Sequence, residues 1–111
     1  HIPVDSEWTT LIDFLGGENL AGGKLKESGT TLWVAPNTGA TNESGFTALP
    51  GGGRKNTGEF VDRGKVALLW SSTTSGISNG VGVGLVNENM SVTIGNSVNG
   101  AGRSVRCLKS K

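Results

Sequence analysis

The chain of 111 residues has only one cysteine and one histidine. A single cysteine excludes an internal disulfide, and one cysteine with one terminal histidine cannot form a zinc site. The nine carboxylates are scattered, and none stands at a spacing that demands acid–base catalysis. These absences predict a protein that is not an enzyme.

Long apolar runs and strong net charge are also missing. No run approaches the roughly 20 apolar residues that a membrane span requires, which predicts no direct membrane insertion. The net charge of +1 argues against nucleic acid as a partner. Basic residues do gather near the C-terminus, where we expect a soluble terminal strand rather than an anion site. They are Arg103, Arg106, Lys109 and Lys111.

Two motifs that suggest catalysis fail in their context. Residues 76–80 match the G-x-S-x-G nucleophile elbow, which needs a preceding strand, a following helix and a histidine partner. The only histidine is His1. Residues 64–65 do not complete a P-loop, because Glu59 replaces its first glycine and Val66 its Ser or Thr.

Composition predicts one loop-rich domain over residues 1–111. Only 34% of residues are hydrophobic and 19 are glycine, which favours turns, loops and short strands around a single core. The large core anchors are few and spread along the chain, so we expect all of it to feed that core. They are Trp8, Trp33, Trp70, Phe14, Phe46 and Phe60.

The N-terminal segment predicts helices. Asp5 and Ser6 supply capping oxygens at the start of a helix over residues 5–15. Apolar residues recur at helical spacing and Gly16 ends the helix. A second short helix is expected over residues 19–26. The apolar stripe consists of Trp8, Leu11, Ile12 and Leu15.

The remainder predicts antiparallel strands, and hence an α+β domain. Extended segments are expected at 32–34 and 46–49, with a turn at 56–58 and a buried strand at 66–72. Residues 80–86 and 91–94 are expected to form a hairpin. Residues 104–109 alternate like a half-buried closing strand, with Cys107 facing inward.

The polar loop over residues 35–45 leaves two interpretations open. Its oxygens are the ligands that hard cations prefer, so calcium is a candidate cofactor. The same side chains also make turns without a metal, and this interpretation is favoured, so no cofactor is predicted. The oxygens come from Asn37, Asn42, Glu43 and Ser44, with Glu59 and Asp62 as further candidates.

Residues 75–102 have an unusual composition. Of these 28 residues, 25 are Asn, Ser, Thr, Gly, Val, Ile or Ala, and none is aromatic or basic. These seven types are reached from an Asn codon when its first base is kept or changed by a transition and its second is free. Short strands with Gly and Asn turns share this composition, so an ordinary sheet and a diversified surface both remain open.

Six sequence blocks together resemble the Fibrobacter succinogenes major paralogous domain, a family related to the C-type-lectin-like and formylglycine-generating-enzyme folds. The blocks occur in the family's order and cover nearly the whole chain. They are HIPVDSEW (1–8), AGGKLK (21–26), ATNESGF (40–46), ALPGG (48–52), WSST (70–73) and SVRC (104–107).

The resemblance implies an exported, lectin-like domain on a bacterial surface or a phage particle. Family members usually carry Thr in place of Val4, which would cap the first helix. They also carry an N-terminal part, absent here, that ends in a cysteine-containing segment. That part is a candidate partner for the domain, and its cysteine for Cys107. The family includes variable proteins of diversity-generating retroelements, whose diversified interval corresponds to residues 75–102.

We therefore expect a non-catalytic ligand-recognition domain that binds a surface protein or a glycan through residues 75–102. The alternative is a structural module of a surface, fimbrial-tip or phage assembly with no free ligand. The expected contact residues are Ser75, Ile77, Ser78, Asn79, Val81, Val83, Val86, Asn87, Asn89, Val92, Asn96, Val98 and Asn99.

Overall fold

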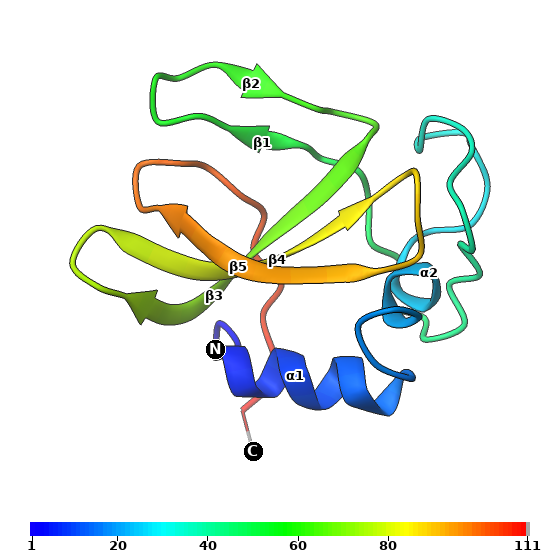
Figure 1. The fold of residues 1–111 in the computed structure, drawn as a ribbon, viewed down its shortest axis with the longest axis horizontal. Helices are drawn as coiled ribbons and strands as arrows, with labels where there is room; N and C mark the ends of the chain where they lie inside the picture. Colours follow the sequence, from blue (N-terminus) through cyan, green and yellow to red (C-terminus); the bar gives the residue numbers. More distant parts are fainter. Residues whose placement is uncertain (111) are drawn as a thin grey trace.

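Two helices come first in the chain and the strands follow, as an α+β domain (Figure 1). A computed structural model describes residues 1–110. Within that part, no helix is both long and apolar enough to cross a membrane. The elements are α1 (Asp5–Phe14), α2 (Ala21–Leu25), β1 (Gly53–Arg54), β2 (Phe60–Val61), β3 (Val66–Ser75), β4 (Asn79–Val86) and β5 (Val92–Val98).

Strands β3, β4 and β5 form an antiparallel sheet in that order, and β1 pairs with β2 in a separate hairpin. In the sheet, Val83 lies opposite Leu69 on one side and Ile94 on the other. Figure 1 shows α1 against one face of the sheet and the β1–β2 hairpin beyond the opposite face. The buried strand and the hairpin predicted from the sequence are both present, and both are longer than expected.

Helix α1 packs on the sheet through the expected stripe, in which Trp8, Ile12 and Leu15 are buried. No side chain caps its start. The Val4 N–H donates to the Glu7 carboxylate at 3.1 Å. The Asp5 carboxylate instead accepts from the Thr73 hydroxyl of β3. The expected cap by Asp5 or Ser6 is therefore absent, and the helix start is tied to the sheet.

Three of the six aromatic anchors lie outside the core. Trp70 is half-buried on the sheet face turned away from α1. Phe14 is 84% exposed because it lies off the apolar stripe of α1, and Phe60 is 80% exposed. Strand β2 has only two residues, so Phe60 reaches no core layer. Its ring lies 5.8 Å from the Arg54 guanidinium. The core prediction was wrong for Phe14, Phe60 and Trp70.

Helix α2 brings a lysine into the interior. Lys26 is fully buried, and its ammonium donates to the carbonyls of Thr38, Val86 and Asn89 at 2.9–3.0 Å. It also lies 5.5 Å from the Trp33 ring centroid. Burial lowers its pKa to about 8. Three donors and three acceptors match, so this ammonium joins the central loop to the end of the β4–β5 hairpin.

The C-terminal segment does not form the expected closing strand. Only Ser104 pairs with the sheet, as a parallel bridge to Leu69. Beyond it, the segment runs to the N-terminus, where the Leu108 N–H donates to the His1 carbonyl at 2.7 Å. Val105 is exposed and so is the Cys107 thiol, which corrects the inward-facing prediction. The segments 32–34 and 46–49 also form no named strand.

Candidate binding surface

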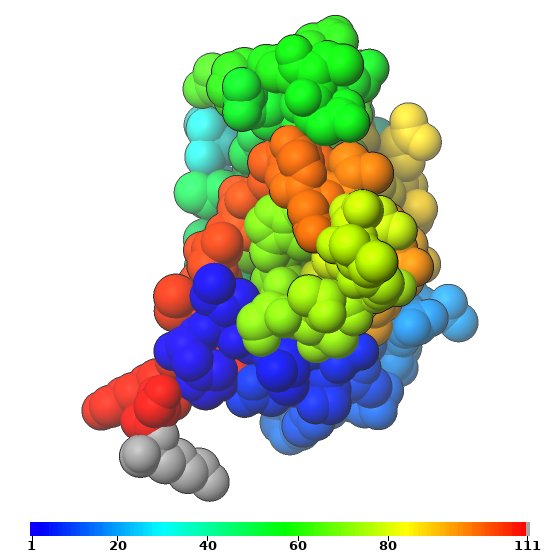
Figure 2. All heavy atoms as spheres, turned by 90° about the vertical axis from the view of Figure 1, so that its left-hand side faces the viewer, coloured from blue at the N-terminus to red at the C-terminus, as the bar shows by residue number. Residues whose placement is uncertain are grey.

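The sheet extends past the N-terminal end of α1, and eight of the thirteen expected contact residues gather on this overhang. We call it the hairpin end. Figure 2 views this side, where the β3–β4 turn and the end of β5 lie next to each other between α1 and the β1–β2 hairpin. The residues are Ser75, Ile77, Ser78, Asn79, Val81, Asn96, Val98 and Asn99.

Strand register places these side chains together. Ser75 lies opposite Asn79, and Asn79 lies opposite Val98 on the next strand. Val81 lies opposite Asn96. The side chains of directly opposed residues point to the same face, so these five share the α1 side of the sheet. Beyond the helix, Asn96 and Val98 are exposed and the other three are half-buried, so the surface is a mixture of amide, hydroxyl and small apolar groups.

The turn at the hairpin end is held by backbone contacts. The Asn99 N–H donates to the Ser78 carbonyl at 2.8 Å, and the Asn99 side chain reaches the Ile77 carbonyl at 3.5 Å. The Ile77 side chain is 100% exposed. A fully exposed isoleucine is available to a ligand, because no residue of the described chain covers it. The turn is also the G-x-S-x-G segment, followed here by a strand rather than a helix.

Five expected contact residues lie elsewhere, and three of them are buried. Val83 and Val92 are 2% and 4% exposed and belong to the core, so the contact prediction is wrong for them. Asn87 is also buried, and its amide donates to the Val34 and Ala35 carbonyls. It holds a loop, so the prediction fails there too.

The other two lie away from the hairpin end. Asn89 is in the β4–β5 turn at the far end of the sheet, where its side chain accepts from the Ser91 N–H. Val86 ends β4 next to that turn, and its half-buried side chain faces away from α1. The distance along β4 separates both residues from the hairpin end by about 20 Å.

On the face of the sheet turned away from α1, the central strand β4 carries mainly glycine. A Cβ on Gly80 would lie 2.8 Å from the Trp70 ring, and one on Gly82 would lie 2.7 Å from a nitrogen of Arg103. The Arg103 guanidinium lies 5.1 Å from the Trp70 ring centroid. The two glycines thus leave the space that this stacked pair fills. A cavity of about 270 Å³ runs from it across Gly84 and Gly95.

Sequence reasoning placed no function on Arg103, which it grouped with a soluble tail. The structure separates it from Arg106, which stacks 4.3 Å from the Phe46 ring and donates to the Phe46 carbonyl at 2.9 Å. The alternation of Gly and Val in β4 is the sequence feature that could have predicted a side chain such as Arg103 over this face. Glycine at every second position of a strand indicates that another group occupies that face.

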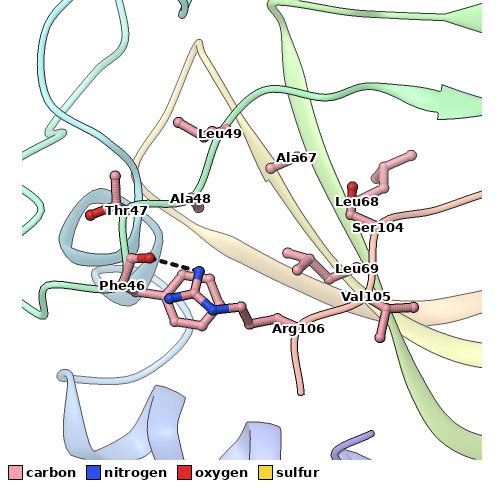
Figure 3. Close-up of a pocket in the computed structure, with 10 residues that line it drawn as sticks. All are labelled: Phe46, Thr47, Ala48, Leu49, Ala67, Leu68, Leu69, Ser104, Val105 and Arg106. Atoms are coloured by element: carbon pink, nitrogen blue, oxygen red, sulfur yellow. Dashed lines mark hydrogen bonds between the residues drawn. The ribbon is translucent and has the colours of Figure 1, made fainter. Parts of the chain in front are cut away.

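Two further cavities lie near the C-terminal segment. The first, about 180 Å³, is bordered by the segment 46–49, β3 and the segment 104–106 (Figure 3). The second, about 130 Å³, lies between α1, Phe46 and Leu108. Trp8 borders it, and the buried Trp8 indole N–H has no hydrogen-bond partner in residues 1–110. Among titratable residues, Arg106 lines the first cavity, and Glu7 and Arg106 line the second.

The central loop uses its side chains in turns. The Asn42 side chain accepts from the Thr47 N–H and donates to the Thr47 hydroxyl, both at 2.8 Å. The Ser44 hydroxyl donates to the Lys24 carbonyl, and the Asn37 amide donates to two loop carbonyls. In residues 1–110 no group of three His, Cys, Asp or Glu side chains could hold a metal ion. These contacts favour turn chemistry over the calcium interpretation.

Comparison with known proteins gives one match. Residues 1–109 match the family described as the Fibrobacter succinogenes major domain. No curated protein and no solved structure matches the chain. The six blocks that carry the resemblance lie on the scaffold described above. Residues 21–26 include Lys26, and residues 70–73 include Thr73, which contacts Asp5 of α1. The chain belongs to the Fibrobacter succinogenes major domain family.

Proposed function

We propose that the chain is a non-catalytic ligand-recognition domain of C-type-lectin-like fold, exported to a bacterial surface or carried on a phage particle. Its ligand, a surface protein or a glycan, contacts the hairpin end. Family membership and the order of helices, long loops and antiparallel strands support the proposed fold.

One observation carries the proposal. Eight residues of the low-complexity interval gather where the sheet extends beyond α1, so their side chains can change without entering the core. Val83 and Val92, from the same interval, lie under α1 in the core. Position along the strands separates the two sets. The strand residues of both sets face the α1 side of the sheet, but the core under α1 ends before the strands do, so it includes only Val83 and Val92.

The hairpin end has the chemistry of an adaptable contact surface. Asn79, Asn96 and Asn99 offer both donors and acceptors, and Ile77 offers apolar area. The surface has no aromatic anchor and no charge. Because aromatic and arginine anchors dominate strong interfaces, we expect this variant to bind weakly through flat polar contacts.

The alternative is a structural module of a surface, fimbrial-tip or phage assembly. The outer edge of β5, described below, supports it because an unpaired strand can join a neighbouring chain. Binding of an isolated soluble target by the free domain would favour recognition. Contacts that form only within an assembly would favour the structural module.

The test is to sequence this locus across a natural population of its source. We expect substitutions at Ile77, Asn96 and Asn99, with Val83 and Val92 constant because core changes unfold the domain. The changed codons should be of the Asn type. Variation spread evenly over core, surface and flanking residues would contradict a diversified surface, and the structural module would then become the leading function.

A further inference from the structure

Arg103 is a half-buried cation without a hydrogen-bond or ion-pair partner among residues 1–110. Its guanidinium stacks on Trp70 above Gly82, and within residues 1–110 it makes no hydrogen bond and no ion pair. The ion pairs in this part of the chain are His1 with Glu7 and Lys55 with Glu59. Guanidinium donors usually meet carboxylate or phosphate oxygens when they are withdrawn from water. An unpaired guanidinium in a cavity therefore indicates an acceptor from outside the chain.

The cavity beside Arg103 leads across the sheet to the outer edge of β5. Gly82 lies opposite Gly95, so neither strand places a side chain along this line. A Cβ at Gly95 would have no atom within 4 Å. Thr93 and Val86 border the cavity, and no acidic residue does. An acidic side chain that enters over Gly95 could approach Arg103 across the two glycines, where it would meet no acidic residue.

The outer edge of β5 has unpaired backbone groups at the same place. The Val92 N–H donates to the Glu18 carbonyl, away from β4. Because alternate residues of an antiparallel strand face the same side, the N–H and C=O groups of Ile94 and Asn96 also face away from β4. Within residues 1–110 no backbone group pairs with them. Strand β5 also contains no charged residue and no proline, the usual protections of an edge strand.

We propose that the β5 edge binds an extended peptide strand of another protein, and that an acidic side chain of this strand pairs with Arg103. The peptide backbone would bond to Ile94 and Asn96, and the acidic residue would lie opposite Gly95. Strands are about 4.8 Å apart, so this residue would start about 10 Å from the line of β4. A glutamate side chain spans about half of that distance, so the Arg103 side chain must turn from Trp70 toward β5 to close the remaining gap of about 5 Å.

A peptide fits these observations better than an acidic sugar does. Sugar sites commonly use an exposed aromatic ring, whereas the Trp70 ring is half-buried, is covered by Arg103 and lies next to Gly80. The row of free backbone groups on β5 matches strand addition, in which main-chain hydrogen bonds give affinity and one side chain gives specificity. The site lies on the face opposite α1, so it goes beyond the proposed function of the hairpin end.

The experiment titrates isotope-labelled domain with synthetic peptides and follows backbone amide shifts by NMR. The probe is a blocked nine-residue peptide of alternating threonine and valine, with lysine at both ends and one central glutamate. One control peptide replaces the glutamate with glutamine. A second carries N-methyl groups on the two residues that flank the glutamate, because these residues face β5. Free glucuronate serves as a sugar-acid probe.

We expect shifts at Ile94 and Asn96, and a Kd about tenfold lower for the glutamate peptide than for the glutamine peptide. The methylated peptide should not bind. In Arg103→Gln the two unmethylated peptides should bind equally, whereas Arg106→Gln, a matched arginine stacked on another ring, should keep the tenfold difference. Thermal unfolding of both variants checks their folding.

Three outcomes would overturn the proposal. Equal affinity of the wild-type domain for the glutamate and glutamine peptides removes the role of Arg103. This comparison uses only the wild-type domain, so it does not depend on the folding of a variant. Shifts at hairpin-end residues with none at Ile94 remove the β5 site. Glucuronate that shifts Arg103 while no peptide binds replaces the peptide with a sugar acid. None of these results depends on whether the hairpin end is diversified, so the two proposals fail separately.

Discussion

The two faces of the β3–β4–β5 sheet differ most on β4. Toward α1 this strand presents Val83 and Leu85, which are buried in the core. Away from α1 it presents Gly80, Gly82 and Gly84, which have no side chains. One face is therefore filled by the strand itself, and the other is filled partly by side chains from β3 and the C-terminal segment and is open beyond them.

This difference shows that β4 contributes no side-chain packing at its glycine positions on the face away from α1. Glycine inside a strand weakens it by roughly 0.5–1 kcal/mol relative to alanine. Three alternate glycines therefore carry a cost that core packing does not require. The stacked pair of Trp70 and Arg103 explains two of them, because a Cβ at either position would overlap that pair. The α1 face therefore supplies the packing that stabilises the domain, and the glycines on the other face leave room for Trp70 and Arg103.

The largest effect is expected on the α1 face. Leu85→Ala should lower the free energy of unfolding by about 2–5 kcal/mol, because it opens a cavity in a fully buried layer. Val86→Ala, one residue further and on the other face, should cost clearly less because Val86 is only half-buried. Urea unfolding of the two variants measures the difference. Equal losses would contradict the contrast between the faces.

A smaller effect is expected on the glycine face, where it should depend on position. In Gly82→Ala the new Cβ would lie 2.6 Å from the Leu69 carbonyl oxygen and 2.7 Å from Arg103. Backbone and guanidinium must both shift, at a cost of about 1–3 kcal/mol. Gly84→Ala is the matched control, because its nearest neighbour is the end of the Leu68 side chain at 3.3 Å. Thermal unfolding should rank Gly82→Ala well below Gly84→Ala, and the reverse ranking would refute the stacked arrangement.

Much of the scaffold could be predicted from local patterns. The apolar spacing in α1, the turn at residues 56–58 and the β4–β5 hairpin each follow from neighbouring residues, which is why they were found. The family could be recognised for a related reason. The blocks that carry the resemblance contain residues with specific structural tasks, such as Lys26, whose ammonium donates to three carbonyls.

The errors concern residues whose environment is set by distant parts of the chain. Val105 and Cys107 alternate with polar residues as in a strand, but β3 pairs with the segment only at Ser104. Phe60 is as apolar as Trp33, and only the position of the short β1–β2 hairpin leaves it exposed. A local sequence pattern indicates whether a residue favours burial or a strand, but tertiary contacts decide whether it is buried or paired.

The candidate site was predicted as an interval but not as a surface. Composition drew attention to residues 75–102, yet it cannot tell which alternate positions face α1 or where the helix ends. Asn96 and Val92 stand on the same face of β5, and only the reach of α1 exposes one and buries the other. Arg103 lies one residue beyond the interval, where composition gave no reason to look.

The smallest effect on stability is expected at the open end of the glycine face. In Gly95→Val the new side chain meets no atom within 4 Å at Cβ, and valine favours strands, so the free energy of unfolding should stay unchanged or rise by up to about 1 kcal/mol. The same side chain would stand between the β5 edge and Arg103. Binding of the glutamate peptide should therefore weaken although the domain is at least as stable. Calorimetric unfolding and the NMR titration measure the two quantities on one sample. A variant that loses stability would show that the open region is packed, and one that binds the peptide as before would show that the acidic side chain does not cross Gly95.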